Sequence, residues 1–188
     1  LIAEHMATLL TVSDGNFLRM NYPSEPVLAE AAYEIEKNNY FEILQNFHSA
    51  LTLGETRAGQ EGEIVGKMIL QKAFDISCPK DIMIFSHSCT VNEFLCNIFG
   101  KESQLFEEFK NSYQLPILDA RIGFTHFIQV HYTPNLEDLE KIVRRRAAIS
   151  LKGGEKGVDF IIPVVFPNNA IGTLLFQVNV NNNFLIFF

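Results

Sequence analysis

Polar residues within two apolar segments near the C-terminus are the strongest candidates for chemistry in this sequence. Asp159 lies at the start of segment 158–166, and Gln177 and Asn179 lie near the end of the next segment, 172–180. Apolar strands seldom carry such residues without a reason, because a buried carboxylate or amide needs a partner. A carboxylate and an amide oxygen a few ångströms apart are hard ligands that suit Mg²⁺. Such an ion can activate water and neutralise charge on a phosphodiester under attack.

The pairing of the two segments decides whether these side chains meet. Gln177 and Asn179 are two residues apart and therefore share one face of a strand. If residues whose numbers sum to 336 are paired, Asp159 lies directly across from Gln177 and the three side chains share one side. This register requires an odd loop or a bulge. In the alternative interpretation, which pattern alone favours, Asp159 ends a turn and the two amides face solvent at a sheet edge.

The first part of the chain is predicted to be helical. Apolar residues recur at helical intervals in 1–12, a second helix is expected after the N-cap candidate Ser24, and a third lies around 40–51. Residues 1–52 are therefore predicted to form a small helical bundle, for which no chemical role is indicated.

The next helix is expected over 61–75, with Glu63 and Lys67 one turn apart. Its predicted buried positions are Ile64, Val65, Met68 and Ile69. Segment 62–67 resembles a phosphate-binding loop, but the spacing is one residue short. Met68 also stands where a magnesium-binding Ser or Thr belongs, so nucleotide binding is excluded at this point.

The remainder of the chain has alternating helical and strand signals, which predict a mixed α/β (α+β) fold. The expected helices cover 91–99, 103–111 and a segment that begins near Asn135; the expected strands cover 124–132, 147–152, 158–166 and 172–180. The predicted core is a small mixed sheet with helices before it and beside it.

Composition excludes several classes of protein. The 188 residues include 47% hydrophobic and 20% charged residues with a formal charge of −7, which is typical of a globular protein. No stretch approaches the roughly 18 apolar residues of a membrane helix, so no membrane association is expected. Three cysteines without framework spacing and the lack of a signal pattern predict an intracellular location, the nucleus included. The histidines lack zinc-site spacing.

The chain also resembles a known family. It resembles the C-terminal region of large fungal proteins related to the Crinklers, in which an NTPase module precedes a domain with the restriction-endonuclease-like, or PD-(D/E)XK, fold. The resemblance is carried by YPSEPVLAEA at 22–31, GEIV at 62–65, RAAI at 146–149 and GVDFIIPV at 157–164. It implies an upstream module or docking helices in 1–52 and a nuclease-like domain with a helical insertion in 53–180. Separately, the polar triplet followed by five apolar residues predicts that 181–188 is an atypical tail, either truncated or foreign to the domain.

The resemblance implies roles for individual residues. Glu63 would be the helix carboxylate, Asp159 the central ligand of Mg²⁺ and Gln177 the variable third ligand. The lysine that the motif places two residues after Gln177 is Asn179 here. A neutral amide cannot stabilise developing negative charge as a lysine does, so catalysis is expected to be weak or absent. Lys67 is the candidate substitute for that lysine.

A basic run could contact DNA. Arg144, Arg145 and Arg146 follow one another, and Lys152 lies nearby. A solvated helix end with favourable dipole interactions is an equally good interpretation of this run.

Three hypotheses follow. The first is a divergent, impaired Mg²⁺-dependent nuclease acting on DNA. The second is a non-catalytic effector or binding module that keeps the nuclease fold as a scaffold. The third is a regulatory region of a multidomain NTPase, whose helices in 1–52 dock on an upstream module.

Overall fold

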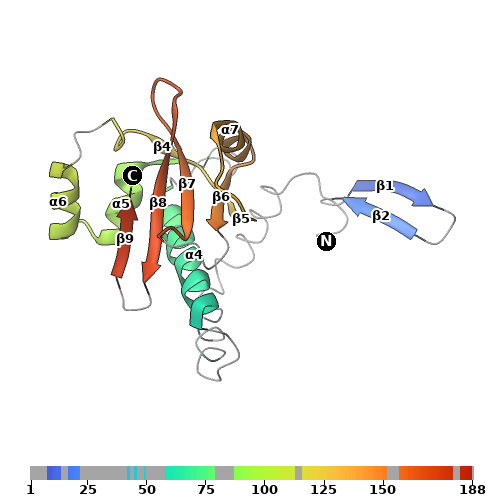
Figure 1. The fold of residues 1–188 in the computed structure, drawn as a ribbon, viewed down its shortest axis with the longest axis horizontal. Coiled ribbons are helices and arrows are strands. Elements are labelled where there is room, and N and C mark those ends of the chain that lie inside the picture. Colours follow the sequence, from blue (N-terminus) through green and yellow to red (C-terminus); the bar gives the residue numbers. More distant parts are fainter. Residues whose placement is uncertain are drawn as a thin grey trace.

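The computed structural model describes residues 8–13, 17–21, 42, 45, 49, 58–78, 87–112, 116–151, 157–179 and 183–187. In these ranges helices and strands alternate around a curled, seven-stranded mixed sheet (Figure 1). The predicted α+β class is therefore confirmed.

Long strand pairs form the centre of the sheet. Strands β6 (Ala147–Leu151), β7 (Phe160–Val165) and β8 (Ile171–Asn179) pair antiparallel in sequence order. Strand β5 (His126–Val130) lies parallel to β6, and helix α7 (Leu136–Arg144) connects the two. The sheet thus combines an antiparallel meander with one parallel β–α–β unit.

Short strands complete the sheet on both sides of this meander. The second half of β7 pairs with β4 (Arg121–Ile122), which pairs with β3 (Cys89–Thr90). Strand β9 (Asn183–Phe187) pairs antiparallel with β8. The apolar stretch that was expected to be a truncated tail therefore contributes a strand to the sheet.

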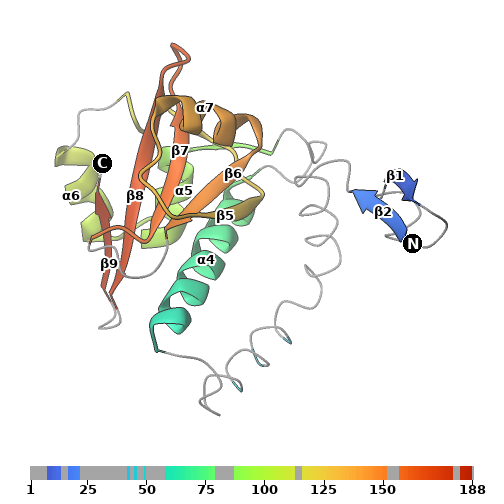
Figure 2. The ribbon, with the colours of Figure 1, turned by 45° about the vertical axis from the view of Figure 1, so that its right-hand side comes forward.

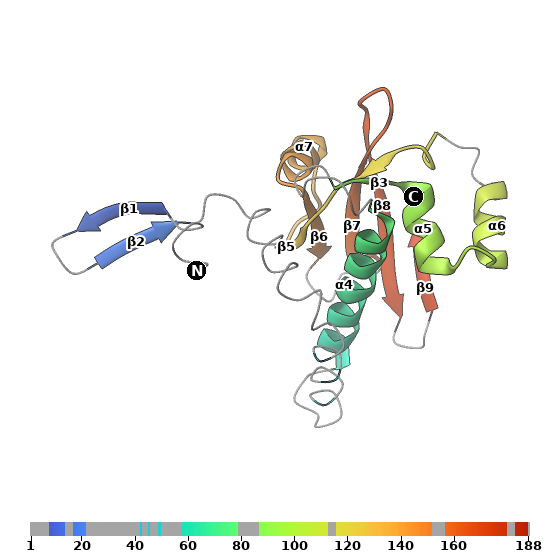
Figure 3. The same cartoon turned by 180° about the vertical axis from the view of Figure 1, so that it is seen from behind.

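Helices cover both faces of the sheet. Helix α4 (Ala58–Ser77) and helix α5 (Val91–Phe99) pack on one face, as Figure 3 shows from behind, and α6 (Gln104–Ser112) follows α5. Helix α7 packs on the opposite face, where Ile142 meets Ile149 and Ile161.

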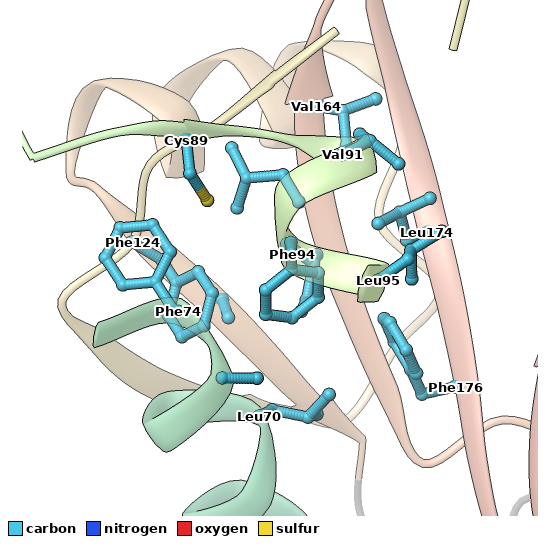
Figure 4. Close-up of a cluster of buried hydrophobic side chains, with 14 of the residues drawn as sticks. Leu70, Phe74, Cys89, Val91, Phe94, Leu95, Phe124, Val164, Leu174 and Phe176 are labelled. Carbon is cyan, nitrogen blue, oxygen red and sulfur yellow. The ribbon is translucent and has the colours of Figure 1, made fainter. Parts of the chain in front are cut away.

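The larger core lies between α4, α5 and the sheet (Figure 4). Phe94 of α5 makes edge-to-face contacts with Phe124 and Phe176, at centroid distances of 6.4 and 6.2 Å. Phe74 of α4 lies 4.6 Å from the ring of Phe124. Aromatic side chains bury large areas and favour such tilted geometries, so these rings fix the position of both helices against the strands.

The face that α4 buries differs from the predicted one. Ile64 and Ile69 are 36% and 37% exposed, whereas Leu70 and Phe74 are buried. Gly66 explains this orientation, because it is buried and a Cβ built on it would lie only 2.5 Å from the ring of Phe160. The backbone of α4 can lie this close to Phe160 because Gly66 has no side chain.

The N-terminal prediction is wrong in its first element. Strands β1 (Thr8–Ser13) and β2 (Phe17–Asn21) pair antiparallel where a helix was expected over 1–12. Glu42, Gln45 and Ser49 are helical, in agreement with the third expected helix. The apolar positions proposed for that helix, and the helix expected after Ser24, lie outside the described residues.

The cysteines occupy the core as small apolar groups. All three are free thiols; Cys78 and Cys89 are buried and Cys96 is half-buried. A hydrogen bond with Cys78 and burial both raise the pKa of the Cys89 thiol. Because the thiolate is the reactive form, Cys89 is poorly nucleophilic.

We therefore expect iodoacetamide to alkylate Cys96 of the folded protein on the order of 100-fold faster than Cys78 or Cys89, whose reaction requires local opening. Mass spectrometry of tryptic peptides measures the three rates. In guanidinium chloride the three rates should become similar. Equal rates in the native protein would contradict the burial of Cys78 and Cys89.

Candidate functional site

The β7–β8 hairpin has the register that the predicted site requires. Phe160 pairs with Phe176 and Val165 with Ile171, so paired residue numbers sum to 336. The loop between Val165 and Ile171 contains an odd number of residues, as predicted. Asn169 adopts a left-handed conformation with φ of 64°, which asparagine tolerates better than most residues.

Asp159 holds the open end of this hairpin together. Its amide donates to the carbonyl of Phe176 at 2.8 Å, and its carbonyl accepts from the amide of Leu151 at 2.9 Å. Its carboxylate Oδ2 accepts from the amide of Val178 at 2.6 Å. The side chain therefore supplies a hydrogen bond across this end of the hairpin. The regular pairing ends at Phe160 and Phe176, and Asp159 is hydrogen-bonded to the two residues on either side of Gln177.

Gln177 lies on the α7 side of the sheet. Strand alternation places Gln177 on the same face as Leu175, which packs in the cluster around α7. Asp159 precedes β7, so alternation does not assign its side chain to a face. Gln177 is half-buried, and its backbone pairs with Leu185 of β9. Asn179 pairs with Asn183 through its backbone, while its side chain lies outside the described part.

Glu63 approaches from the opposite face. Its Oε1 accepts from the Ser150 hydroxyl at 2.6 Å and from Lys67 Nζ at 2.7 Å. Ser150 is fully buried and pairs with Phe160 across the β6–β7 ladder, so both residues face α4. The neighbouring residue Gly62 faces Val178, and a Cβ built there would lie 3.8 Å from its side chain. Glu63 and Gln177 thus lie at one end of the sheet on different faces.

The environment of Glu63 favours its charged form. Burial raises the pKa of this carboxyl, but the hydrogen bonds from Lys67 and Ser150 and the charge of Lys67 together lower it below 4.5. Lys67 Nζ lies 2.7 Å from Glu63 Oε1, so the helical pair expected from the sequence forms an ion pair. Glu63 is therefore an ionised side chain whose Oε1 already receives two donors.

Asp159, Gln177 and Glu63 differ in how well they are suited to coordinate Mg²⁺. Mg²⁺ needs one or two carboxylates and several waters, with oxygens about 2 Å from the ion. Asp159 and Gln177 fit this requirement in donor type, since no described residue donates a hydrogen bond to Asp159 Oδ1 or to the Gln177 amide oxygen. Glu63 would have to leave Lys67 or Ser150. Among described residues, no cluster of three or more His, Cys, Asp or Glu side chains forms a metal site.

The arginine run is divided between surface and interior. Arg144 ends α7 and Arg145 caps it, and both are exposed. Arg146 is half-buried with φ of 53°, and its guanidinium donates to the carbonyl of His87. Two of the three arginines are thus placed to contact a ligand from solvent. Lys152 lies outside the described residues.

A pocket beside α7 was not predicted from the sequence. Its volume is about 400 Å³, and it is lined by Ile128, Gln129, Val130, His131, Tyr132, Asp138, Lys141, Ile142 and Arg145. One sequence signal could have indicated it: Asp138, Lys141, Ile142 and Arg145 recur at helical spacing shortly after a strand that is followed by His131 and Tyr132.

The fold and the site define an α+β domain with a polar end of a mixed sheet and a second, basic pocket beside the crossover helix. A family model described as "Domain of unknown function (DUF8736)" matches residues 1–185, and the chain belongs to this family. The match spans both boundaries predicted after residues 52 and 180. No curated protein and no solved structure matches the chain. Among described residues, none of the helices has the length and apolar character needed to cross a membrane.

Proposed function

We propose that this chain is a divergent nuclease-like domain of the PD-(D/E)XK type that binds DNA and in which Mg²⁺-dependent cleavage is impaired. The observation that carries this proposal is the hydrogen bonding of Asp159 to Phe176 and Val178, on either side of Gln177, at the end of the sheet that Glu63 also reaches. A carboxylate and an amide in this position agree with a hairpin metal site of that fold.

Three features support impairment of the chemistry. Asn179 occupies the position of the motif lysine and carries no charge. The ammonium of Lys67 lies against Glu63 and neutralises it. Asp159 uses one carboxylate oxygen to hold the amide of Val178. Bound Mg²⁺ would supply charge neutralisation at the phosphodiester and a more acidic water, and Asp159 with Gln177 would orient it.

Exposed cations on α7 supply a surface for DNA. Lys141, Arg144 and Arg145 lie in its last two turns and are exposed. Phosphate contacts by such side chains release counterions and depend strongly on salt. We further propose DNA and an upstream NTPase module of the same chain as partners, and an intracellular, nuclear location.

The test is Mg²⁺-dependent nicking of supercoiled plasmid by the full chain. Asp159→Asn keeps an oxygen that can accept from Val178 and removes the charge, so it separates metal binding from folding. We expect slow nicking that falls at least about tenfold in this variant, because metal-assisted catalysis loses its central carboxylate. Asp119→Asn, an exposed acid in a turn, is the matched control. Nicking that Asp159→Asn leaves unchanged would contradict the assigned site.

A non-catalytic binding module is the second candidate, and the hydrogen bonds that both carboxylates already accept favour it. This candidate predicts salt-sensitive DNA binding that is equal in Mg²⁺ and in EDTA, with no nicking. Arg144→Glu should weaken that binding. Binding that requires Mg²⁺ and Asp159 would favour the nuclease instead.

A further inference from the structure

The pocket beside α7 lies where parallel α/β units commonly hold ligands. Strands β5 and β6 are parallel, with Val130 paired to Leu151, and α7 connects them (Figure 2). The pocket includes the last residues of β5 and the two residues that follow it, His131 and Tyr132. In open α/β sheets, ligands bind outside the carboxyl ends of the strands, at the point where the strand order reverses. Here β5 is an edge strand of the described sheet, and the pocket shares with such sites its position at the carboxyl end of a parallel strand.

The pocket has an apolar base and a polar rim. Ile128, Val130 and Ile142 belong to the cluster between the sheet and α7 and supply the base. The ring of Tyr132 is 53% exposed at the rim, and Gln129 is exposed beside it. An apolar floor with an aromatic side chain at its edge favours a flat, ring-containing ligand, because such a ring can bury its faces there.

The charges of the pocket come from one stripe of α7. Asp138, Lys141 and Arg145 are spaced three and four residues apart with Ile142 and line the same pocket. The pocket therefore has two permanent cations against one carboxylate. Lys141 contacts Glu137 at 2.7 Å, but both side chains are mostly exposed, at 63% and 75%. Such surface pairs are weak and exchange partners easily, so Lys141 can turn to an anionic ligand.

The start of α7 is already occupied by its own residues. Asn135 accepts from the amide of Asp138 at 3.0 Å, and the Asp138 carboxylate accepts from the amide of Asn135 at 3.2 Å. Because this capping box already uses these two amides at the start of α7, the anionic group of a ligand would contact side chains further along the helix. The anionic end of a ligand therefore belongs near Lys141 and Arg145, and a hydroxyl or amine that donates to a carboxylate belongs near Asp138.

We propose that this pocket binds a nucleoside monophosphate group, either as a free mononucleotide or as the 5′-phosphorylated end of a strand. The base lies over Ile128 and Ile142 beside Tyr132, and the phosphate lies between Lys141 and Arg145. A volume of about 400 Å³ is within the usual range of small-ligand pockets. This site lies on the α7 face and does not depend on cleavage at Asp159.

Isothermal titration of the full chain tests the proposal with AMP, adenosine and inorganic phosphate as separate probes. We expect AMP to bind at least about tenfold more tightly than either fragment, because the ring and the phosphate contact different parts of the pocket. Arg145→Glu should weaken AMP binding at least about tenfold. Lys101→Glu makes a similar charge change at an exposed turn residue outside the pocket and should change it less than about twofold.

A second pair of measurements identifies the source of the phosphate. A strand end is supported if a 5′-phosphorylated oligodeoxynucleotide binds better than its unphosphorylated form and loses this advantage in Arg145→Glu. A free mononucleotide is supported if AMP binds tightly and the oligodeoxynucleotide shows no such preference. Gln129→Trp should block the binding of both AMP and the 5′-phosphorylated oligodeoxynucleotide, because the larger side chain at this exposed position fills the pocket. AMP that binds no better than phosphate, or equal effects of Lys101→Glu and Arg145→Glu, would overturn the proposal. Loss of DNA binding alone would leave it standing.

Discussion

Replacing Gly66 with valine is expected to destabilise the protein by about 3 kcal/mol, the upper part of the range for overpacked cores. A Cβ at this position would lie 2.5 and 2.9 Å from two ring atoms of Phe160 and 2.9 Å from Val178 Cγ2. Phe160 is fully buried, so its ring has no room to move away. Helix α4 would have to move off the sheet and would carry Glu63 with it.

Gly62→Ala is the matched control for this substitution. Gly62 lies one turn earlier on the same helix, and its nearest contact for a new Cβ is 3.8 Å from Val178, an ordinary packing distance. Alanine should stabilise the helix here by up to about 1 kcal/mol, because glycine is a poor helix former. Urea unfolding monitored by circular dichroism measures both variants. If Gly66→Val unfolds at the same urea concentration as the original protein, α4 does not pack on β7 and β8 as described.

Elements with strong local signals were predicted well. The expected helix 91–99 coincides with α5, where Thr90 and Glu93 form a capping box. The helix expected from Asn135 begins with another capping box between Asn135 and Asp138. Caps of this kind depend on residues three positions apart in sequence, so they are visible without knowledge of the rest of the fold.

Features that depend on distant contacts were not predicted. The buried face of α4 is set by the close approach of Gly66 to Phe160, which periodicity alone does not reveal. Residues 8–13 have apolar residues at helical spacing, but they also include Thr8, Thr11 and Val12, whose β-branched side chains favour a strand. Pairing with β2 decides between these two tendencies.

The register of the β7–β8 hairpin at the candidate site was predicted from the sequence, but the hydrogen bonds of Asp159 and Glu63 were not. Parity of residue numbers was sufficient to predict the register from Phe160 to Val165, but the regular pairing ends one residue short of Asp159. The hydrogen bond from the amide of Val178 to Asp159, and the one from Ser150 to Glu63, required coordinates. Ser150 was read only as part of a strand, although it is the one fully buried polar residue among the described residues. A serine within an apolar strand is a signal that a partner lies across the core.

Glu63→Ala is expected to destabilise the protein by about 1–3 kcal/mol, because it leaves the hydroxyl of Ser150 buried without this acceptor. Ser150 is 0% exposed and lies 2.6 Å from Glu63 Oε1, so water cannot easily replace the carboxylate. Lys67 also loses its partner, but its side chain is 32% exposed and contributes little. Ser150→Ala in addition should recover part of the loss, since it removes the unpaired hydroxyl. Strictly additive effects in this double-mutant cycle would show that the two side chains do not interact.

The pH dependence of Glu63→Gln separates the charge of Glu63 from its hydrogen bond. Glutamine can still accept from Ser150 but does not attract Lys67, so its effect should be smaller than that of alanine. The folded-state pKa of Glu63 lies below its ordinary value, so its charge stabilises the protein above the unfolded pKa of about 4.5. This stabilisation is lost as the pH falls through the lower folded-state pKa. The difference between the original protein and Glu63→Gln should therefore be largest at neutral pH and disappear in acid. A difference that stays constant from pH 7 to pH 3 in urea unfolding would show that the Glu63 carboxylate is not the titrating group.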